Sequence, residues 1–291
     1  MGEFFNLVFI NPITNVLVVL YHVFSFVHFP YALGFAIIGL TIVIRFILYP
    51  FTTSQLKASL KMQKVAPHLS RIKEKHKGDS VRIQQETMKI YKEHGVNPAA
   101  GCLPVIIQMP IIWSLYSVLQ HVVNIKSGAV VAEINKVVYF DFLKLHNAWD
   151  PSFFGLSLGI KPQDILPFSK LLSIPTTEHL ILLVPIVTGV LQFLLSKMMI
   201  PAKTAVASDA TAVAIIEKDK EKAQVDKKDA GDFASTFQTQ SMFIFPVMIG
   251  FFSFSFPIGL SLYWNTFTIF GIIQQYKITG LGGLSTWIKK K

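Results

Sequence analysis

Residues 31–51 read YALGFAIIGLTIVIRFILYPF, a run that is long and apolar enough to cross a membrane but contains Arg45. A helix over this run is about 30 Å long, which matches the hydrocarbon core of a bilayer. An arginine near the middle of such a helix costs about 2.5–3.5 kcal/mol on insertion scales. The run contains no acidic residue that could pair with it. The stretch therefore predicts a membrane span that contains an arginine without an acidic partner in the span. The cost of this charge calls for an explanation.

The composition of the whole chain is that of a membrane protein. Of its 291 residues, 52% are hydrophobic and 15% are charged, whereas soluble domains are about 25% charged. The net charge is +10, and the basic residues lie between apolar runs. This pattern favours a signal for membrane topology over nucleic-acid binding. The single cysteine, Cys102, excludes an intrachain disulfide, and the motifs HExxH, CxxC and GxxxxGK[ST] do not occur. We therefore expect no metal, no cofactor and no ATPase activity.

Five apolar runs predict an all-α polytopic membrane protein with five transmembrane helices. One helix through the last two runs would be about 50 Å long, too long for a bilayer. Pro257 and Gly259 favour a turn between them instead. The five predicted spans are Tyr31–Phe51, Cys102–Val123, Leu180–Ile200, Thr239–Phe256 and Leu260–Tyr276.

The N-terminal residues 4–28 are also apolar and fit either a sixth span or a helix lying in the membrane interface. Asn15, His22 and Ser25 fall near one helical face, which favours the interfacial helix. The first basic residue is Arg45, so the N-terminus lacks the basic start of a signal peptide. We expect an N-terminal interfacial segment over 1–30, a five-span core over 31–278 and a short basic tail over 279–291.

Loop charges predict the orientation. Residues 52–101 hold ten Lys or Arg against four acidic residues, which places this loop in the cytoplasm. Five spans then put the N-terminus outside and the C-terminus in the cytoplasm. Apolar residues at helical spacing on both sides of Gly78–Asp79 predict an antiparallel helical hairpin, with a kink at Pro67. The second cytoplasmic loop, 201–238, is charged enough to be a solvated linker.

The hairpin carries a basic face that either is simply solvated or binds anionic lipid, a ribosome or targeting factors. The residues of this face are Lys73, Lys75 and Lys77.

Arg45 belongs to a polar stripe, because Thr41, Tyr49 and Thr53 stand at intervals of four residues from it. Alone, Arg45 fits an anchor that snorkels to the membrane surface, and any one stripe fits ordinary hydrogen bonding between helices. Several stripes and an arginine without an acidic partner indicate a shared, hydrated cavity that attracts acidic groups. The stripes of the other spans are Gln108, Tyr116 and Gln120; Ser117, His121 and Asn124; Thr188, Gln192 and Ser196; and Ser261, Asn265 and Thr268, beside Trp264.

Three stretches together resemble the YidC/Oxa family of membrane protein insertases. They are IRFILYPFTTSQLKASLKMQKVAPHLSRIKEKHKGD (44–79), KIYKEHGVNPAAGCLPVIIQMPIIWSLYSVL (89–119) and FPIGLSLYWNTFTIFGIIQQ (256–275). The resemblance implies a five-span core with a groove open to the cytoplasm and to lipid. It also implies insertion of nascent membrane protein clients, alone or beside the Sec translocon, with ribosomes as their source. We expect the client groove to be lined by Arg45, Thr41, Gln108, Gln192, Trp264 and Asn265.

Other functions have weaker support. Gly155–Gly159 fits GxSxG, but a nucleophile elbow needs a strand–turn–helix context, so we expect no enzyme. A secondary transporter is the main alternative, yet its coupling site usually includes an intramembrane carboxylate, and the five runs contain no Asp or Glu. A scaffold protein would explain the hairpin but not Arg45. The sequence therefore favours an insertase without a small-molecule substrate.

Overall fold

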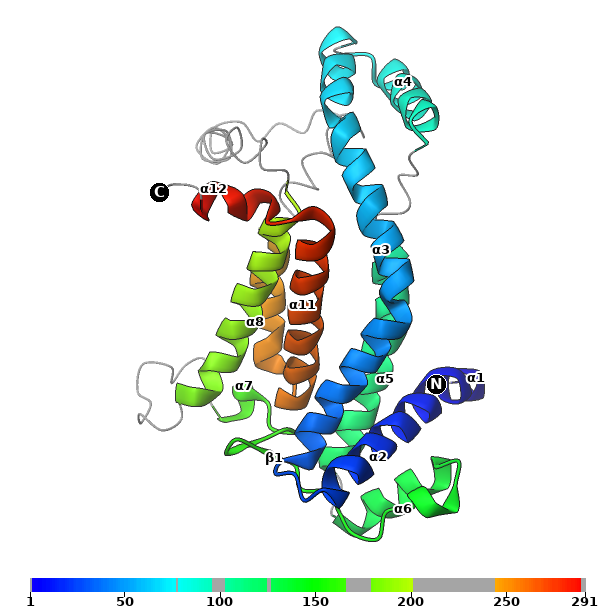
Figure 1. Ribbon diagram of the computed structural model, residues 1–291, viewed down its shortest axis with the longest axis vertical. Helices are drawn as coiled ribbons and strands as arrows, with labels where there is room; N and C mark the ends of the chain where they lie inside the picture. The colour runs from blue at the N-terminus through cyan, green and yellow to red at the C-terminus, as the bar shows by residue number, and fades with distance from the viewer. Residues whose placement is uncertain are drawn as a thin grey trace. The chain divides into compact units, whose positions relative to one another are not determined.

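The computed structural model describes residues 2–76, 78–95, 103–124, 127–165, 179–200 and 244–288, and these are mostly helical. Figure 1 shows the helices along the chain. The longer ones are α2 (Asn11–Phe26), α3 (Ala32–Lys75), α4 (Ser80–Glu93), α5 (Leu103–Asn124), α6 (Ser127–Val137), α8 (His179–Met198), a helix over Ile244–Ser255, and α11 (Ile258–Thr279). The short ones are α1 (Glu3–Phe5), η1 (Asn6–Ile10), η3 (Asp141–Leu143), α7 (Pro162–Ile165), η5 (Gly282–Leu284) and α12 (Ser285–Ile288).

Three helices of the described chain are long and apolar enough to cross a membrane, by length and composition. They cover Glu3–Phe26, Ala32–Met62 and Ile181–Met198. Large apolar side chains stay exposed on them, such as Phe46 and Ile47 on α3 and Ile186 on α8. A soluble protein rarely exposes so much apolar surface, so these faces fit contact with lipid.

The helix boundaries follow the sequence pattern closely. The helix over Ile244–Ser255 ends before Pro257, and α11 begins at Ile258, as the FPIGL turn predicts. α3 continues from the first predicted span into the first arm of the predicted hairpin, and Pro67 does not end it. Gly78 has a φ of 97°, and the backbone N–H of Arg82 donates to Asp79 Oδ1 at 3.0 Å, which caps α4. The predicted linker 201–238 lies outside the described residues.

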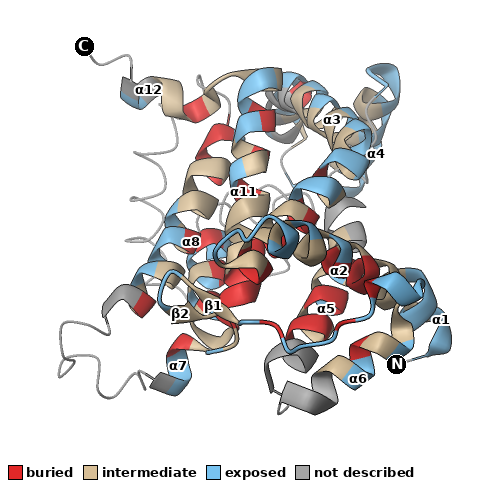
Figure 2. Ribbon diagram, turned by 60° about the horizontal axis from the view of Figure 1, so that its bottom comes forward, coloured by how far each residue is buried: buried red, intermediate tan, exposed pale blue. Residues whose placement is uncertain are grey.

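The chain forms two compact units. The first comprises Met1–Tyr49, Pro104–Leu191 and Met248–Phe270, and the second comprises Pro50–Leu103, Gln192–Val247 and Gly271–Lys291. The core of the first unit lies where α2, α3, α5 and α11 meet, and Figure 2 shows the buried residues along these helices. Its most buried side chains include Leu17, Leu33, Ile37, Leu40, Leu115, Leu119, Leu260 and Tyr263.

A small β-hairpin in the first unit departs from the all-α prediction. Strands β1 (Ser152–Phe153) and β2 (Leu156–Ser157) pair antiparallel, and both turn residues, Phe154 and Gly155, have positive φ. The GxSxG sequence therefore lies in a turn and a two-residue strand, without the strand–turn–helix of a nucleophile elbow. The segment that follows caps α11, because Ile258 N donates to Ile160 O at 3.0 Å and Gly259 N to Leu158 O at 2.7 Å.

The polar face of α2 contacts the segment that follows α6. Asn15 Nδ2 donates to Val137 O at 2.9 Å, and Asn15 Oδ1 accepts from Tyr139 N at 2.7 Å. His22 Nε2 lies 3.0 Å from Leu143 O. The polarity that the sequence suggested for a lipid interface thus serves to bind backbone groups of another segment.

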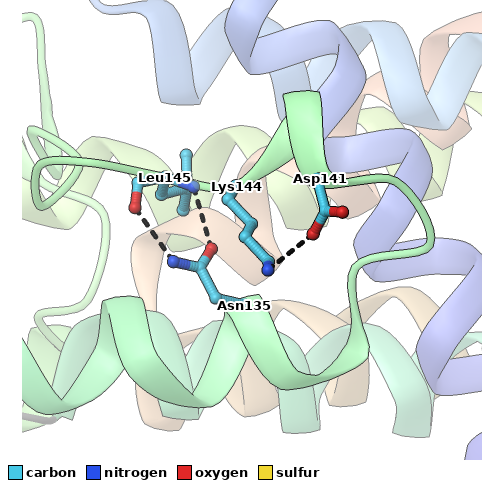
Figure 3. Close-up of polar contacts among 4 residues, drawn as sticks. All are labelled: Asn135, Asp141, Lys144 and Leu145. Atoms are coloured by element: carbon cyan, nitrogen blue, oxygen red, sulfur yellow. Dashed lines mark hydrogen bonds and ion pairs between the residues drawn. The ribbon is translucent and has the colours of Figure 1, made fainter.

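Contacts between its own residues hold the loop after α6 in place, and Figure 3 shows them. Asn135 Nδ2 donates to Leu145 O at 2.9 Å, and Leu145 N donates to Asn135 Oδ1 at 2.8 Å. Lys144 Nζ lies 2.6 Å from Asp141 Oδ1 on the surface, and this contact holds the pKa of the Asp141 carboxyl below its usual range. These contacts fix the conformation of the loop, and so they fix the positions of the backbone groups that bind α2.

We predict that Asn15→Ala destabilises the protein by about 1–3 kcal/mol, because the partly buried hydrogen bonds of Asn15 with Tyr139 N–H and Val137 C=O are lost. The measurement is the midpoint temperature of thermal unfolding in detergent. Unfolding is monitored as the loss of monodisperse protein. The matched control is Asn6→Ala, which removes an exposed amide and should leave the midpoint nearly unchanged. Equal midpoints for the two variants would contradict the docking role of Asn15.

Candidate functional site

Arg45 is buried, with 5% of its surface exposed, and binds the backbone of α11. Its Nε donates to Phe267 O at 3.1 Å, and Nη2 donates to the same carbonyl. The guanidinium carbon lies 3.4 Å from the centre of the Phe267 ring and 5.6 Å from that of Phe270. A carbonyl dipole and the faces of two rings therefore stabilise the charge in the apolar interior.

No carboxylate neutralises this charge in the part of the chain that the structure describes. The ion pairs there are Lys136 with Glu133 and Lys144 with Asp141, both in the segment between α5 and α8. An arginine has five N–H donors, and the hydrogen bonds found for Arg45 use only Nε and Nη2. Its Nη1 therefore has no acceptor among the described residues.

A second polar contact joins α5 to α11. Gln108 Nε2 donates to the hydroxyl of Tyr263 at 2.8 Å, and Tyr263 is fully buried. Tyr263 and Phe267 are one helical turn apart, so the two contacts lie on the same side of α11. Tyr263 is not among the predicted site residues, because it stands between apolar residues and outside the polar stripe of its helix.

Thr41, the predicted neighbour of Arg45, turns its hydroxyl toward its own helix. Thr41 is fully buried, and its Oγ1 donates to Ile37 O at 2.7 Å. Ser114 on α5 does the same with Pro110 O at 2.7 Å. Such bonds let a hydroxyl lie in an apolar interior without a partner on another helix.

The opposite side of α11 holds a different polar cluster, shared with α8 and the Ile244–Ser255 helix. The hydroxyl of Ser253 lies 3.3 Å from that of Thr188 and 2.9 Å from that of Ser261. A Cβ on Gly250 would stand 3.2 Å from the Cα of Gly189, so these two helices approach closely. The cluster binds three helices through small and hydroxyl-bearing residues, as membrane helix interfaces often do.

The predicted groove residues therefore lie in several surroundings. Arg45, Thr41 and Gln108 belong to the side of α11 that carries Tyr263 and Phe267. By its spacing of about 100° per residue, Asn265 lies on the Ser261 side, and its Oδ1 is buried without a hydrogen-bond partner among the described residues.

The remaining predicted site residues do not form one cluster among the described residues. Trp264 is partly buried, and Gln192 is partly buried and belongs to the second unit. Of the predicted basic face, Lys75 is exposed, the side chain of Lys73 is not described, and Lys77 lies outside the described residues.

In the second unit, an amide joins α3 to α11. Gln274 Nε2 donates to the hydroxyls of Thr52 at 2.9 Å and Thr53 at 3.0 Å. Gln274 is 2% exposed, so this contact is buried. Of its three residues, only Thr53 belonged to a stripe that the sequence singled out.

Comparison with known proteins identifies relatives over most of the chain. A family model described as 60Kd inner membrane protein matches residues 22–281. The inner membrane protein ALBINO3, chloroplastic, of Arabidopsis thaliana is 33% identical over 270 residues, which is 89% of this chain and 49% of that protein. The membrane protein insertase YidC of Fusobacterium nucleatum is 30% identical over 249 residues, which is 86% of this chain and 87% of that protein.

A third relative, the membrane protein insertase YidC of Rickettsia felis, is 29% identical over 84% of this chain and 35% of that protein. The chain thus spans about half or less of the length of several of its curated relatives. None of these names denotes an enzyme class. Since the family model covers most of the chain and the helices are apolar enough to span a membrane, the chain is a multi-pass membrane protein that belongs to the 60Kd inner membrane protein family, which is the YidC/Oxa family.

Proposed function

We propose that this protein is a membrane protein insertase that moves the polar tail of a client across the membrane and releases the client's apolar span into lipid. The observation that carries the proposal is Arg45, a buried cation without a carboxylate partner among the described residues, in an apolar helix. Membership of the family supports it, because relatives from Fusobacterium nucleatum and Rickettsia felis are named insertases. Such a charge is costly in a membrane and is usually kept for function.

The proposed core has five spans over residues 31–278, with α3, α5, α8, the Ile244–Ser255 helix and α11 as the spanning helices. Contacts of α3 with α11 support this order. Within the first unit, Arg45 contacts Phe267 and Tyr49 contacts Phe270, so the two helices run in the same direction. The first and last of five spans must be parallel. The positive loop 52–101 then faces the cytoplasm of a bacterial plasma membrane, the N-terminus lies outside and the tail 279–291 lies inside.

Residues 1–30 form, in this proposal, a helix that lies at the outer interface. Asn15 and His22 bind the segment 137–143 from the middle and the end of the apolar stretch Glu3–Phe26. That segment belongs to the outer loop of the proposed topology. A spanning helix would place its middle in the hydrocarbon core, where the polar backbone of a loop does not belong.

Arg45 acts on clients by electrostatics. On this side of α11, Tyr263 and Thr41 are fully buried and Gln108 is partly buried, so the groups offered to a client are Arg45 Nη1 and the Gln108 amide. In the proposed groove beside Arg45, water shortens the dry path that a polar tail must cross. A carboxylate of the tail binds the guanidinium at intermediate depth, because charge-assisted hydrogen bonds are strong in a low-dielectric interior.

The client's apolar span then moves over the lipid-facing sides of α8 and α11 and leaves laterally. These helices expose large apolar residues, including Val187, Val190 and Ile273. Burial of the client's own span in lipid drives the step, at about 25 cal/mol per Å² of apolar surface. A membrane potential adds about 2.3 kcal/mol for each negative charge moved outward at 100 mV.

The hairpin formed by the second part of α3 and by α4 is the proposed contact for partners in the cytoplasm. The rings of His68 and His94 lie 5.8 Å apart, which supports an antiparallel arrangement of its two arms. Its basic residues fit anionic lipid headgroups or the RNA of a ribosome that delivers clients, beside the Sec translocon or without it.

The topology predicts which positions an impermeant reagent reaches. With Cys102 replaced by alanine, a cysteine at Asp79 should react with an impermeant maleimide only after cell lysis. A cysteine at Asn6 should react in intact cells, because the proposed N-terminal helix lies outside. Labelling of position 79 in intact cells would invert the topology, and protection of position 6 would favour a sixth span.

The charge of Arg45 should matter most for clients with acidic tails. Arg45→Lys should keep most insertion, because an ammonium still attracts a carboxylate, although it lacks the fork of the guanidinium. Arg45→Ala should lower insertion of an acidic-tailed client by about tenfold, the equivalent of about 1.4 kcal/mol, and Arg45→Glu should lower it further.

The measurement compares two clients that differ only in the acidity of their tails, with yields divided by the amount of each variant in the membrane. The neutral-tailed client should lose much less. Equal losses for both clients would reduce Arg45 to a structural anchor. A change in solute flux through liposomes without any change in client insertion would favour the transporter.

A further inference from the structure

The chain that follows α11 folds back onto the end of α8. α11 ends at Thr279, and Gly280, with a φ of 72°, lets its N–H donate to Tyr276 O at 2.9 Å. The next residues form η5 and α12. All of these residues and the end of α8 belong to the second unit.

Two glycines bring the backbone of η5 against the last carbonyls of α8. A Cβ on Gly282, whose φ is 50°, would stand 1.9 Å from Met198 O, and a Cβ on Gly283 would stand 2.7 Å from Lys197 O. Real Cβ atoms do not approach so closely, so any side chain there would push the two segments apart. Gly280 is different, since a Cβ there would meet nothing within 4 Å.

The contact covers a helix end that has polar groups to satisfy. The last four carbonyls of an α-helix have no partner within the helix. At the end of α8, Met198 O accepts from Gln275 Nε2 at a long 3.5 Å, and Lys197 O accepts from Ile200 N at 3.3 Å. Close packing of η5 covers this end, and a buried backbone carbonyl without a hydrogen-bond partner is costly.

A tryptophan closes the contact from α12. The Trp287 ring stacks on Phe193 at 6.1 Å with an interplanar angle of 28°, and Lys197 Nζ lies 5.2 Å from its centre. Lys197 is 4% exposed and forms no ion pair among the described residues. The ring thus covers a buried cation, and the carbonyl end of α8 favours a positive charge there.

We propose that residues 280–288 are a latch that holds the C-terminal ends of α8 and α11 together, with Gly282, Gly283 and Trp287 as positioning residues. The role in insertion rests on the proposed function, in which the client slides over these two helices. When the latch holds α8 and α11 together, the client contacts their outer faces and cannot enter between the two helices. Loss of the latch should reduce insertion of acidic-tailed and neutral-tailed clients alike, unlike loss of the Arg45 charge.

The test uses a full-length chain in native membranes with Cys102 replaced by alanine and the cysteine pair F193C/W287C. The glycine contacts remain in this background, so a short bifunctional maleimide should join the two cysteines. Gly282→Ala should lower the yield of this cross-link by about tenfold or more, because overpacking against a backbone carbonyl cannot be relieved by a rotamer change. In the chain that keeps Phe193 and Trp287, the same change should lower insertion of both clients several-fold, at equal protein level.

Gly280→Ala is the matched control. It imposes the same left-handed strain without a clash, so cross-linking and insertion should change by about twofold at most. A cross-link that survives Gly282→Ala overturns the latch. A lost cross-link with unchanged insertion overturns its role in insertion. The cross-link needs no client, so it tests the latch even if the proposed function fails.

Discussion

The energetic constraint on this protein is one positive charge in an apolar helix. Arg45 cannot reach a carboxylate in the described chain, so the carbonyl of Phe267 and two aromatic faces take its place. A dipole and a quadrupole reduce the cost of burial without cancelling the charge. An arginine held in this way still attracts an anion, and in the proposed function the acidic tail of a client is that anion. An Arg45–carboxylate pair within the protein would have removed that attraction.

In the first unit, α11 contacts Arg45 on one side and packs against two other helices on the other side. One side of the helix binds Arg45 and Gln108 through Phe267 and Tyr263. The other side joins α8 and the Ile244–Ser255 helix through the hydroxyls of Ser261, Ser253 and Thr188. Packing on the Ser261 side of α11 therefore fixes the position of the side that binds Arg45. Within the second unit, its end is fixed again by Gln274 and by the chain that follows it.

Much of this arrangement could be predicted from the sequence, because apolar runs and FPIGL are local signals. The motifs around Arg45 also indicated the family, and its isolated charge made it the first candidate for a site residue. The partner of Gln108 could not be predicted, because Tyr263 gives no periodic signal among apolar residues. Asn15 and His22 looked suited to a lipid interface, yet they bind a loop more than a hundred residues away. Sequence shows that a residue is polar, whereas its partner depends on which segments meet.

If the tail of a client rests at Arg45 during insertion, as proposed, cross-linking should detect it there. A client is stalled during insertion with a photo-reactive residue beside the single aspartate of its tail. We expect cross-links to the part of α3 that contains Arg45, and we expect fewer of them when that aspartate is changed to asparagine. Cross-links that do not change with the charge of the tail, or that go to lipid alone, would contradict this proposal.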